Sequence, residues 1–206
     1  RQLGGVQPHL ADNHCYHPWL INEGISLPAP VSNSVVYDSM IADRKVATGI
    51  GIHDSSASLV PYFMGTSEHF ILISTGTWCI FMNPFNTEPL TAEQLEKDSL
   101  CYMSIQQQQV KSSRLFLGHI HDVNTERLSR HFGVGKDFYK TVKTNDHKVS
   151  RLLQGKQERF FFRHGIPADY VDTAADLSCF LTFDEAYHRL ISDLVDLGME
   201  SLRLII

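Results

Sequence analysis

The sequence predicts an α/β fold in which a mixed β-sheet is flanked by helices. In the first half of the chain, short apolar runs rich in β-branched and aromatic residues are bounded by Gly, Ser, Thr or Pro, as is typical of strands. In the second half, apolar residues recur at the spacing of a helix face over much longer segments. Strands followed by long helices favour a layered α/β arrangement over an all-β or all-α one.

Three runs are predicted to be buried strands, namely 46–52, 70–73 and 79–82. The second and third runs are separated only by a short polar segment, which predicts an antiparallel β-hairpin with STGTW at its tip. The run of glutamines between LCYMSI and VKSSRLFL predicts a second hairpin, with a polar turn.

His53 and Asp54 follow the first predicted strand. A strand end would hold the main chain firmly while the aspartate side chain reaches the cleft outside the sheet, which suits a general base. The alternative is that Asp54 serves only as the N-cap of a helix that starts at Ser55. The residues by themselves leave both interpretations open.

Thr75, Gly76 and Thr77 form the predicted hairpin tip. Free backbone N–H groups, two hydroxyls and a glycine without a Cβ make such a tip suitable for holding phosphate oxygens. The alternative is a turn whose residues are required only by its backbone geometry.

The stretch GIGIHDSSASLVPYF, followed by FILISTGTW, resembles the start of the second domain of the FGGY carbohydrate kinases, and is most similar to the rhamnulokinase, fuculokinase and xylulokinase branch. The resemblance implies the actin-like ATPase fold, which is ribonuclease H-like. It also implies that Asp54 is the catalytic base, that His53 and Asp54 bind the sugar, and that the hairpin tip binds the phosphates of ATP. The tip residues are Thr75, Gly76 and Thr77. Ile52, Ser55 and Thr75 stand where the family often has Gly, Thr and Ser.

The implied reaction transfers the γ-phosphate of ATP, with Mg²⁺ as the metal, to a hydroxyl of a ketose such as rhamnulose, fuculose or xylulose. Residues 1–45 resemble the tail of the first, sugar-binding domain with a proline-containing linker, and 46–206 resemble the second, ATP-binding domain. The resemblance further implies a truncated second domain, without the first phosphate loop and the adenosine loop, so that this segment alone is expected to be inactive.

Two other classes of function stay open. A non-catalytic, actin-like ATP-binding module would use the hairpin tip but would not need Asp54. A metal-dependent hydrolase could draw on the 11 histidines, although no metal-ligand spacing with a second carboxylate is found.

The composition of the chain excludes some classes of binding partner. A net charge of −5 and a pI near 6.1 argue against nucleic acid, and no apolar run approaches the ~20 residues needed to cross a membrane. The four cysteines are scattered, as expected of reduced thiols in a cytoplasmic protein. The sequence does not decide whether the chain forms homo-oligomers.

Three helices are predicted beyond the first hairpin. One follows Thr91, one runs over 119–140 with Gly133 as its C-cap, and a long one begins after a capping box at 182–185. Lys111 and Arg114 lie beside predicted strands, where they either reach a ligand phosphate or are simply solvated.

Overall fold

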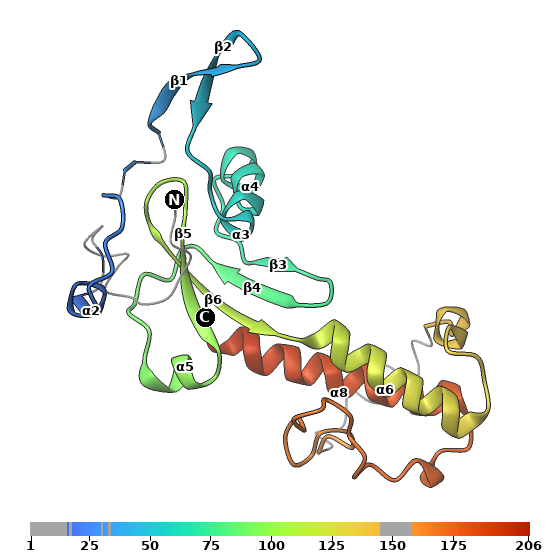
Figure 1. Cartoon of the computed structure of the whole chain (residues 1–206). Helices are drawn as coiled ribbons and strands as arrows, with labels where there is room; N and C mark the ends of the chain where they lie inside the picture. The colour runs from blue at the N-terminus through green and yellow to red at the C-terminus, as the bar shows by residue number, and fades with distance from the viewer. Residues whose placement is uncertain (1–15, 17, 30, 33, 145–157) are drawn as a thin grey trace. The chain divides into compact units, whose positions relative to one another are not determined.

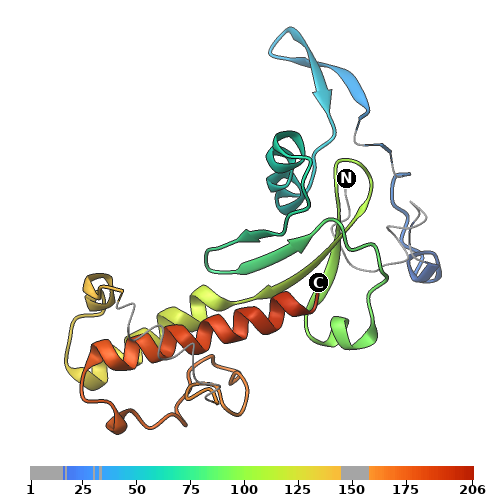
Figure 2. The same cartoon turned by 180° about the vertical axis from the view of Figure 1, so that it is seen from behind.

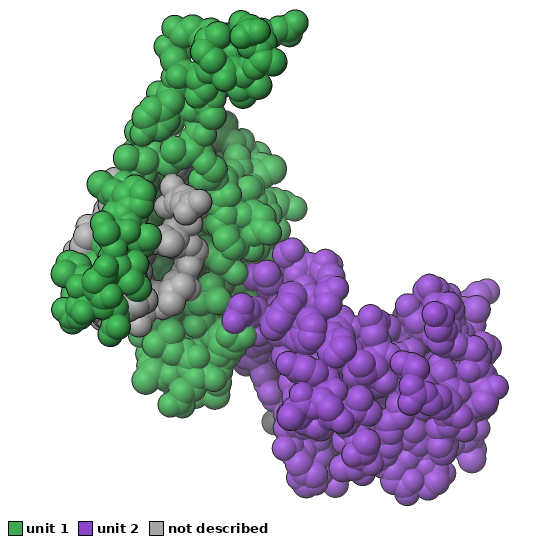
Figure 3. Space-filling model, viewed as in Figure 1, with its two compact units in different colours: residues 1–73, 81–113, 204–206 green, residues 74–80, 114–203 purple. Residues whose placement is uncertain are grey.

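The computed structural model describes residues 16, 18–29, 31, 32, 34–144 and 158–206. Of the predicted first-domain tail, residues 1–15, 17, 30 and 33 lie outside this part. The chain divides into two compact units (Figure 3). Unit 1 comprises residues 1–73, 81–113 and 204–206, and unit 2 comprises 74–80 and 114–203.

Along the described residues of unit 1, the first elements are the short helix α2 (Pro18–Asn22) and a two-stranded hairpin (Figure 1). β1 (Val36–Ile41) and β2 (Arg44–Gly49) pair antiparallel, with Val36 opposite Gly49. Every residue of β2 is exposed, so the predicted buried strand over 46–52 is wrong in both its extent and its burial. β-Branched residues favour extended backbone whether or not a second layer covers them, and the Gly-Ile-Gly sequence then ends the strand.

The main sheet has the strand order β3-β4-β6-β5. β3 (Leu72–Ser74) and β4 (Cys79–Asn83) are neighbours joined only by residues 75–78, a connection too short for anything but antiparallel pairing. The predicted first hairpin is therefore confirmed. β4 is mostly buried, whereas β3 is largely exposed, so only the second of these two runs is a buried strand.

The second predicted hairpin is also confirmed. β5 (Ser99–Met103) and β6 (Gln109–Leu115) pair antiparallel, from Ser99 opposite Ser113 to Met103 opposite Gln109. Helix α5 (Ala92–Glu96) precedes them, and Thr91 and Gln94 form its capping box. Lys111 is only 1% exposed, so the expectation that it is solvated is wrong.

Between β2 and β3, unit 1 contains α3 (Asp54–Ser58) and α4 (Val60–Gly65). Serines and alanine fill α3, and Pro61 stands near the start of α4, where a proline costs no hydrogen bond. The buried apolar residues of this unit include Leu59, Phe81, Met82, Tyr102 and Val110.

Unit 2 is built on two helices that lie side by side, α6 (Leu117–Phe132) and α8 (Phe183–Arg203) (Figures 1 and 2). Gly133 ends α6 in the left-handed conformation, with φ 65°, as a C-cap glycine does. Thr182 accepts a hydrogen bond from the N–H of Glu185 at the start of α8. Short 3₁₀ turns, η1 (Phe138–Thr141) and η2 (Leu177–Cys179), lie in the connection. The buried core includes Ile120, Leu128, Phe161, Phe162, Leu177, Ala186, Leu190 and Leu194.

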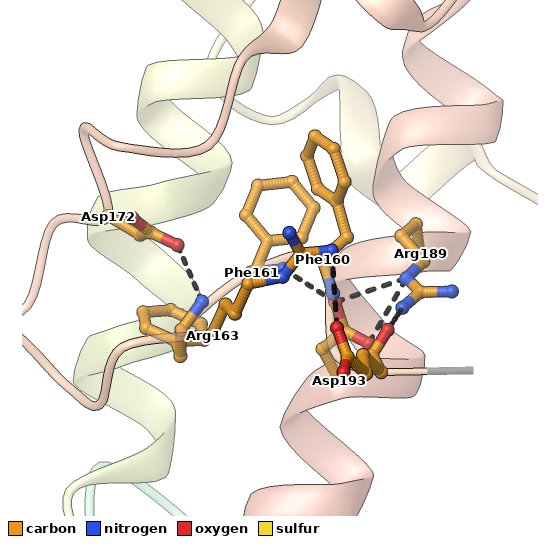
Figure 4. Close-up of polar contacts among 8 residues, drawn as sticks. Phe160, Phe161, Arg163, Asp172, Arg189 and Asp193 are labelled. Atoms are coloured by element: carbon orange, nitrogen blue, oxygen red, sulfur yellow. Dashed lines mark hydrogen bonds and ion pairs between the residues drawn. The ribbon is translucent and has the colours of Figure 1, made fainter. Parts of the chain in front are cut away.

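Two buried aspartates, Asp193 of α8 and Asp172, accept hydrogen bonds from the backbone of a turn of three phenylalanines (Figure 4). Asp193 Oδ2 accepts from the N–H groups of Phe160 (2.9 Å) and Phe161 (2.7 Å), and Asp172 Oδ2 accepts from the N–H of Phe162 (2.5 Å). Arg189 Nε lies 3.1 Å from Asp193 Oδ1. Burial raises the pKa of Asp193, against the opposing effects of these hydrogen bonds and of Arg189.

Candidate functional site

The first half of the candidate site is the start of α3. The helix begins at Asp54, and His53 is its N-cap, with φ −64° and ψ 140°. The N–H of Ser55 donates to Asp54 Oδ1 at 2.7 Å and lies 3.3 Å from His53 Nδ1, so both side chains share this helix-start donor. His53 Nδ1 lies 3.2 Å from Asp54 Oδ1.

His53 and Asp54 differ in how open they are. The His53 side chain is 37% exposed, and its ring stacks on Tyr102 of β5 with 5.0 Å between the ring centroids. The Asp54 side chain is 94% exposed. A carboxylate fixed through one oxygen and open elsewhere can accept a proton from a bound hydroxyl, so its capping contact and a role as base are compatible.

The way in which Asp54 is held differs from the prediction. β2 ends at Gly49, and residues 50–53 have no regular secondary structure. The main chain at Asp54 is therefore anchored by the first turn of α3 and by the His53–Tyr102 stack, and not by the end of a buried strand. Sequence reasoning missed Tyr102, because nothing in the order of residues indicates which aromatic ring lies against His53.

The second half of the candidate site is the hairpin tip. Thr75, Gly76 and Thr77 are all exposed. Gly76 does not have a positive φ, and a Cβ built on it would meet only the Trp78 carbonyl oxygen, at 3.9 Å. Neither the local backbone nor the packing of the protein therefore requires a glycine here, which weakens the interpretation that Gly76 serves only the turn geometry. The position of the missing Cβ is instead open, in a tip whose neighbouring residues are both threonines.

The tip is packed against the N-terminal end of α6 within unit 2. The ring centroids of Trp78 and Phe116 lie 4.5 Å apart, and Phe116 is the N-cap residue of α6. The Arg114 guanidinium lies over the Trp78 ring, 5.3 Å from the ring centroid. Arg114 is exposed and stacked on Trp78, a contact that the sequence did not reveal.

The predicted residues thus form two local groups. His53 and Asp54 lie together in unit 1, and Thr75, Gly76 and Thr77 lie together in unit 2.

The described residues also bear on three other kinds of feature, namely a metal site, a disulfide and a membrane-spanning helix. Among them, no group of three or more His, Cys, Asp or Glu side chains could hold a metal ion. Cys79 and Cys179 are free thiols. Within the same residues, no helix combines the length and the apolar character needed to span a bilayer.

Comparison with known proteins gives a likeness in fold. No model of a protein family matches the sequence, and no curated protein does. Among solved structures, the chain is similar to a carbohydrate kinase from Novosphingobium aromaticivorans, with a TM-score of 0.56 and 19% sequence identity, over 95% of this chain and 45% of that chain. The chain therefore spans less than half the length of that kinase. The likeness shows the fold: α/β, that of a carbohydrate kinase, and compatible with the actin-like ATPase fold.

Proposed function

We propose that this chain is part of an ATP-dependent carbohydrate kinase of the FGGY type, which phosphorylates a hydroxyl of a ketose such as rhamnulose, fuculose or xylulose. The observation that carries the proposal is the geometry of Asp54: its main chain is fixed by the first turn of α3, while its carboxylate is 94% exposed. The likeness in fold to a carbohydrate kinase supports the same assignment.

In the proposed reaction, Asp54 takes the proton from a sugar hydroxyl as that oxygen attacks the γ-phosphorus of ATP. The bond from the γ-phosphorus to the bridging oxygen breaks, and ADP leaves with the electron pair. His53, held by Tyr102, binds the sugar beside the base. Catalysis of this kind depends mainly on positioning and on stabilising charge, because the phosphoryl group itself needs little covalent help.

The hairpin tip supplies the phosphate contacts in the proposal. The hydroxyls of Thr75 and Thr77 and the open backbone at Gly76 would bind phosphate oxygens. Mg²⁺ would neutralise charge on these oxygens.

We also propose a domain organisation and a cellular location for the protein. Residues 1–45 would end a sugar-binding domain, 46–206 would form most of an ATP-binding domain, and the protein would work in the cytoplasm.

The direct test uses the full-length kinase of which this chain is proposed to be part. The protein is incubated with Mg·ATP and a panel of ketoses and aldoses, and the release of ADP is measured. We expect release that depends on one ketose or a few, above the rate with ATP alone. Binding of Mg·ATP without any sugar-dependent release would favour a non-catalytic ATP-binding module. Failure to bind Mg·ATP would contradict both functions.

Thr77→Val tests the phosphate contact separately. Loss of the hydroxyl should weaken Mg·ATP binding by about 0.5 to 3 kcal/mol, depending on the charge of its partner, and titration calorimetry measures the difference. The sugar dependence should be retained. Unchanged nucleotide affinity would remove Thr77 from the site.

A further inference from the structure

Gly118, in the first turn of α6, makes the closest backbone approach to the hairpin tip. A Cβ built on Gly118 would lie 2.2 Å from the carbonyl oxygen of Gly76, 2.8 Å from Thr77 Cα and 3.0 Å from Gly76 C. All three are backbone atoms, so no side chain can rotate away to make room. Any residue other than glycine would therefore have to move the tip, the helix, or both.

A backbone hydrogen bond joins α6 to the tip at the same place. The N–H of Gly118 donates to the carbonyl oxygen of Thr77 at 3.1 Å. N–H groups in the first turn of a helix have no partner within the helix, so this bond satisfies one of them with the tip itself. The packing of Trp78 on Phe116 reinforces the same junction.

Helix formation does not explain the glycine. In a helix, glycine is less favourable than alanine by roughly 0.5 to 1 kcal/mol. Gly118 has no positive φ that would call for a glycine either. The close approach to Gly76 and Thr77 is thus the structural reason for its presence.

We propose that Gly118 is a positioning residue for the phosphate-binding tip: it lets the backbone of α6 lie directly against Gly76 and Thr77 and so fixes where the tip stands. The part of this inference that concerns phosphate rests on the proposed function. Its physical core, the fixing of the tip by Gly118, does not.

Gly118→Ala in the intact protein is the test, with Gly135→Ala as the matched control. Gly135 also lies in unit 2 and has no positive φ, and a Cβ on it would meet nothing within 4 Å. In Gly118→Ala the tip and the start of α6 must separate by about 1 Å to restore ordinary contact distances, which changes where the tip stands relative to the helix. A shift of that size should weaken Mg·ATP binding by roughly 10- to 100-fold. Gly135→Ala should leave the affinity unchanged.

Two readouts separate positioning from a general structural role. The first is the dissociation constant of Mg·ATP, measured by calorimetry well below the melting temperature, where both variants are folded. The second is amide hydrogen exchange, which should speed up at residues 75–78 and 118 and stay unchanged along α8. A Gly118→Ala protein that melts lower but binds Mg·ATP as tightly as wild type would overturn the proposal.

If Gly118→Ala does not fold, Trp78→Ala decides the question. It leaves α6 intact and releases the tip from Phe116. Weaker Mg·ATP binding together with faster exchange at 75–78 would support positioning by this junction, and normal binding would contradict it. If the wild-type protein itself does not bind Mg·ATP, the proposed function fails. The exchange rates at the tip in either variant then decide the positioning role by themselves.

Discussion

His53 carries two contacts at once, one with the first turn of α3 and one with the Tyr102 ring. A residue with two structural contacts can be important for stability without touching a substrate. Substitutions that keep one contact and remove the other can distinguish these roles, because asparagine is as good an N-cap as any residue but cannot stack like an imidazole.

We therefore expect His53→Asn to lose the stacking on Tyr102, which contributes about 0.5 to 1.5 kcal/mol to the free energy of unfolding. The melting temperature should fall modestly as a result. If His53 also binds the sugar, the KM for sugar should rise roughly tenfold, the value of one lost hydrogen bond. His69→Asn is the matched control, because His69 also stacks on an aromatic ring, Phe85, in the same unit, at 4.2 Å. An unchanged sugar KM in His53→Asn would limit His53 to a structural role.

Asp193 shows how burial changes the chemistry of a single carboxylate. Its native pKa is raised by burial, so above its unfolded value, near 4, the folded state binds more protons than the unfolded state. The contribution of Asp193 to stability is then fully present below that value and is lost as the pH rises through the native pKa.

The test compares the wild-type protein with Asp193→Asn, which cannot titrate at this position. We expect the melting temperature of wild type minus that of the variant to decrease as the pH rises from about 4 to 7. Three exposed acids also have lowered pKa values, namely Glu93, Asp137 and Asp176. Both proteins contain them, so their effects on stability cancel in the difference between the two melting temperatures. A difference that grows with pH would mean that Arg189 and the amide donors outweigh burial.

At the scale of elements, strands and helix starts with local chemical cues were predictable. The capping box at Thr91, the C-cap at Gly133 and the turn between β3 and β4 are each encoded within a few neighbouring residues. Burial of a strand is a tertiary property. The β-branched residues of β2 therefore predicted a strand correctly but not its exposure, and an isolated lysine in β6 gave no sign that it is buried.

Lys111 in β6 offers a test of that burial. It is 1% exposed, so its side chain is fully buried within unit 1. Replacing it with methionine removes a buried charge and keeps most of the side-chain volume, so we expect Lys111→Met to raise the free energy of unfolding by about 1 kcal/mol in denaturant titrations. Lys97→Met, which changes an exposed lysine of the same unit, should stay within about 0.5 kcal/mol of wild type. Loss of Mg·ATP affinity in Lys111→Met would instead give Lys111 a role at the phosphates.

At the scale of the whole molecule, the α/β fold was predictable because the same local signals recur along the chain. The similarity to a carbohydrate kinase structure at 19% identity agrees with that prediction. The residues of the candidate site were found because they stand next to each other in the sequence, as His53 and Asp54 do. Contacts between distant segments, such as Gly118 with Gly76 or Tyr102 with His53, required the structure.

The central claim is that Asp54 is a base in sugar phosphorylation, and turnover of Asp54→Asn tests it most directly. The amide oxygen can still accept the N–H of Ser55, so the melting temperature and the affinity for Mg·ATP should stay near wild type. Asp43→Asn, at an exposed turn position with φ 62° that asparagine tolerates, is the control and should turn over normally. We predict that sugar-dependent ADP release by Asp54→Asn falls by roughly two to four orders of magnitude. Near-normal release would mean that Asp54 serves only to bind the N–H of Ser55 in the first turn of α3, and would contradict the account.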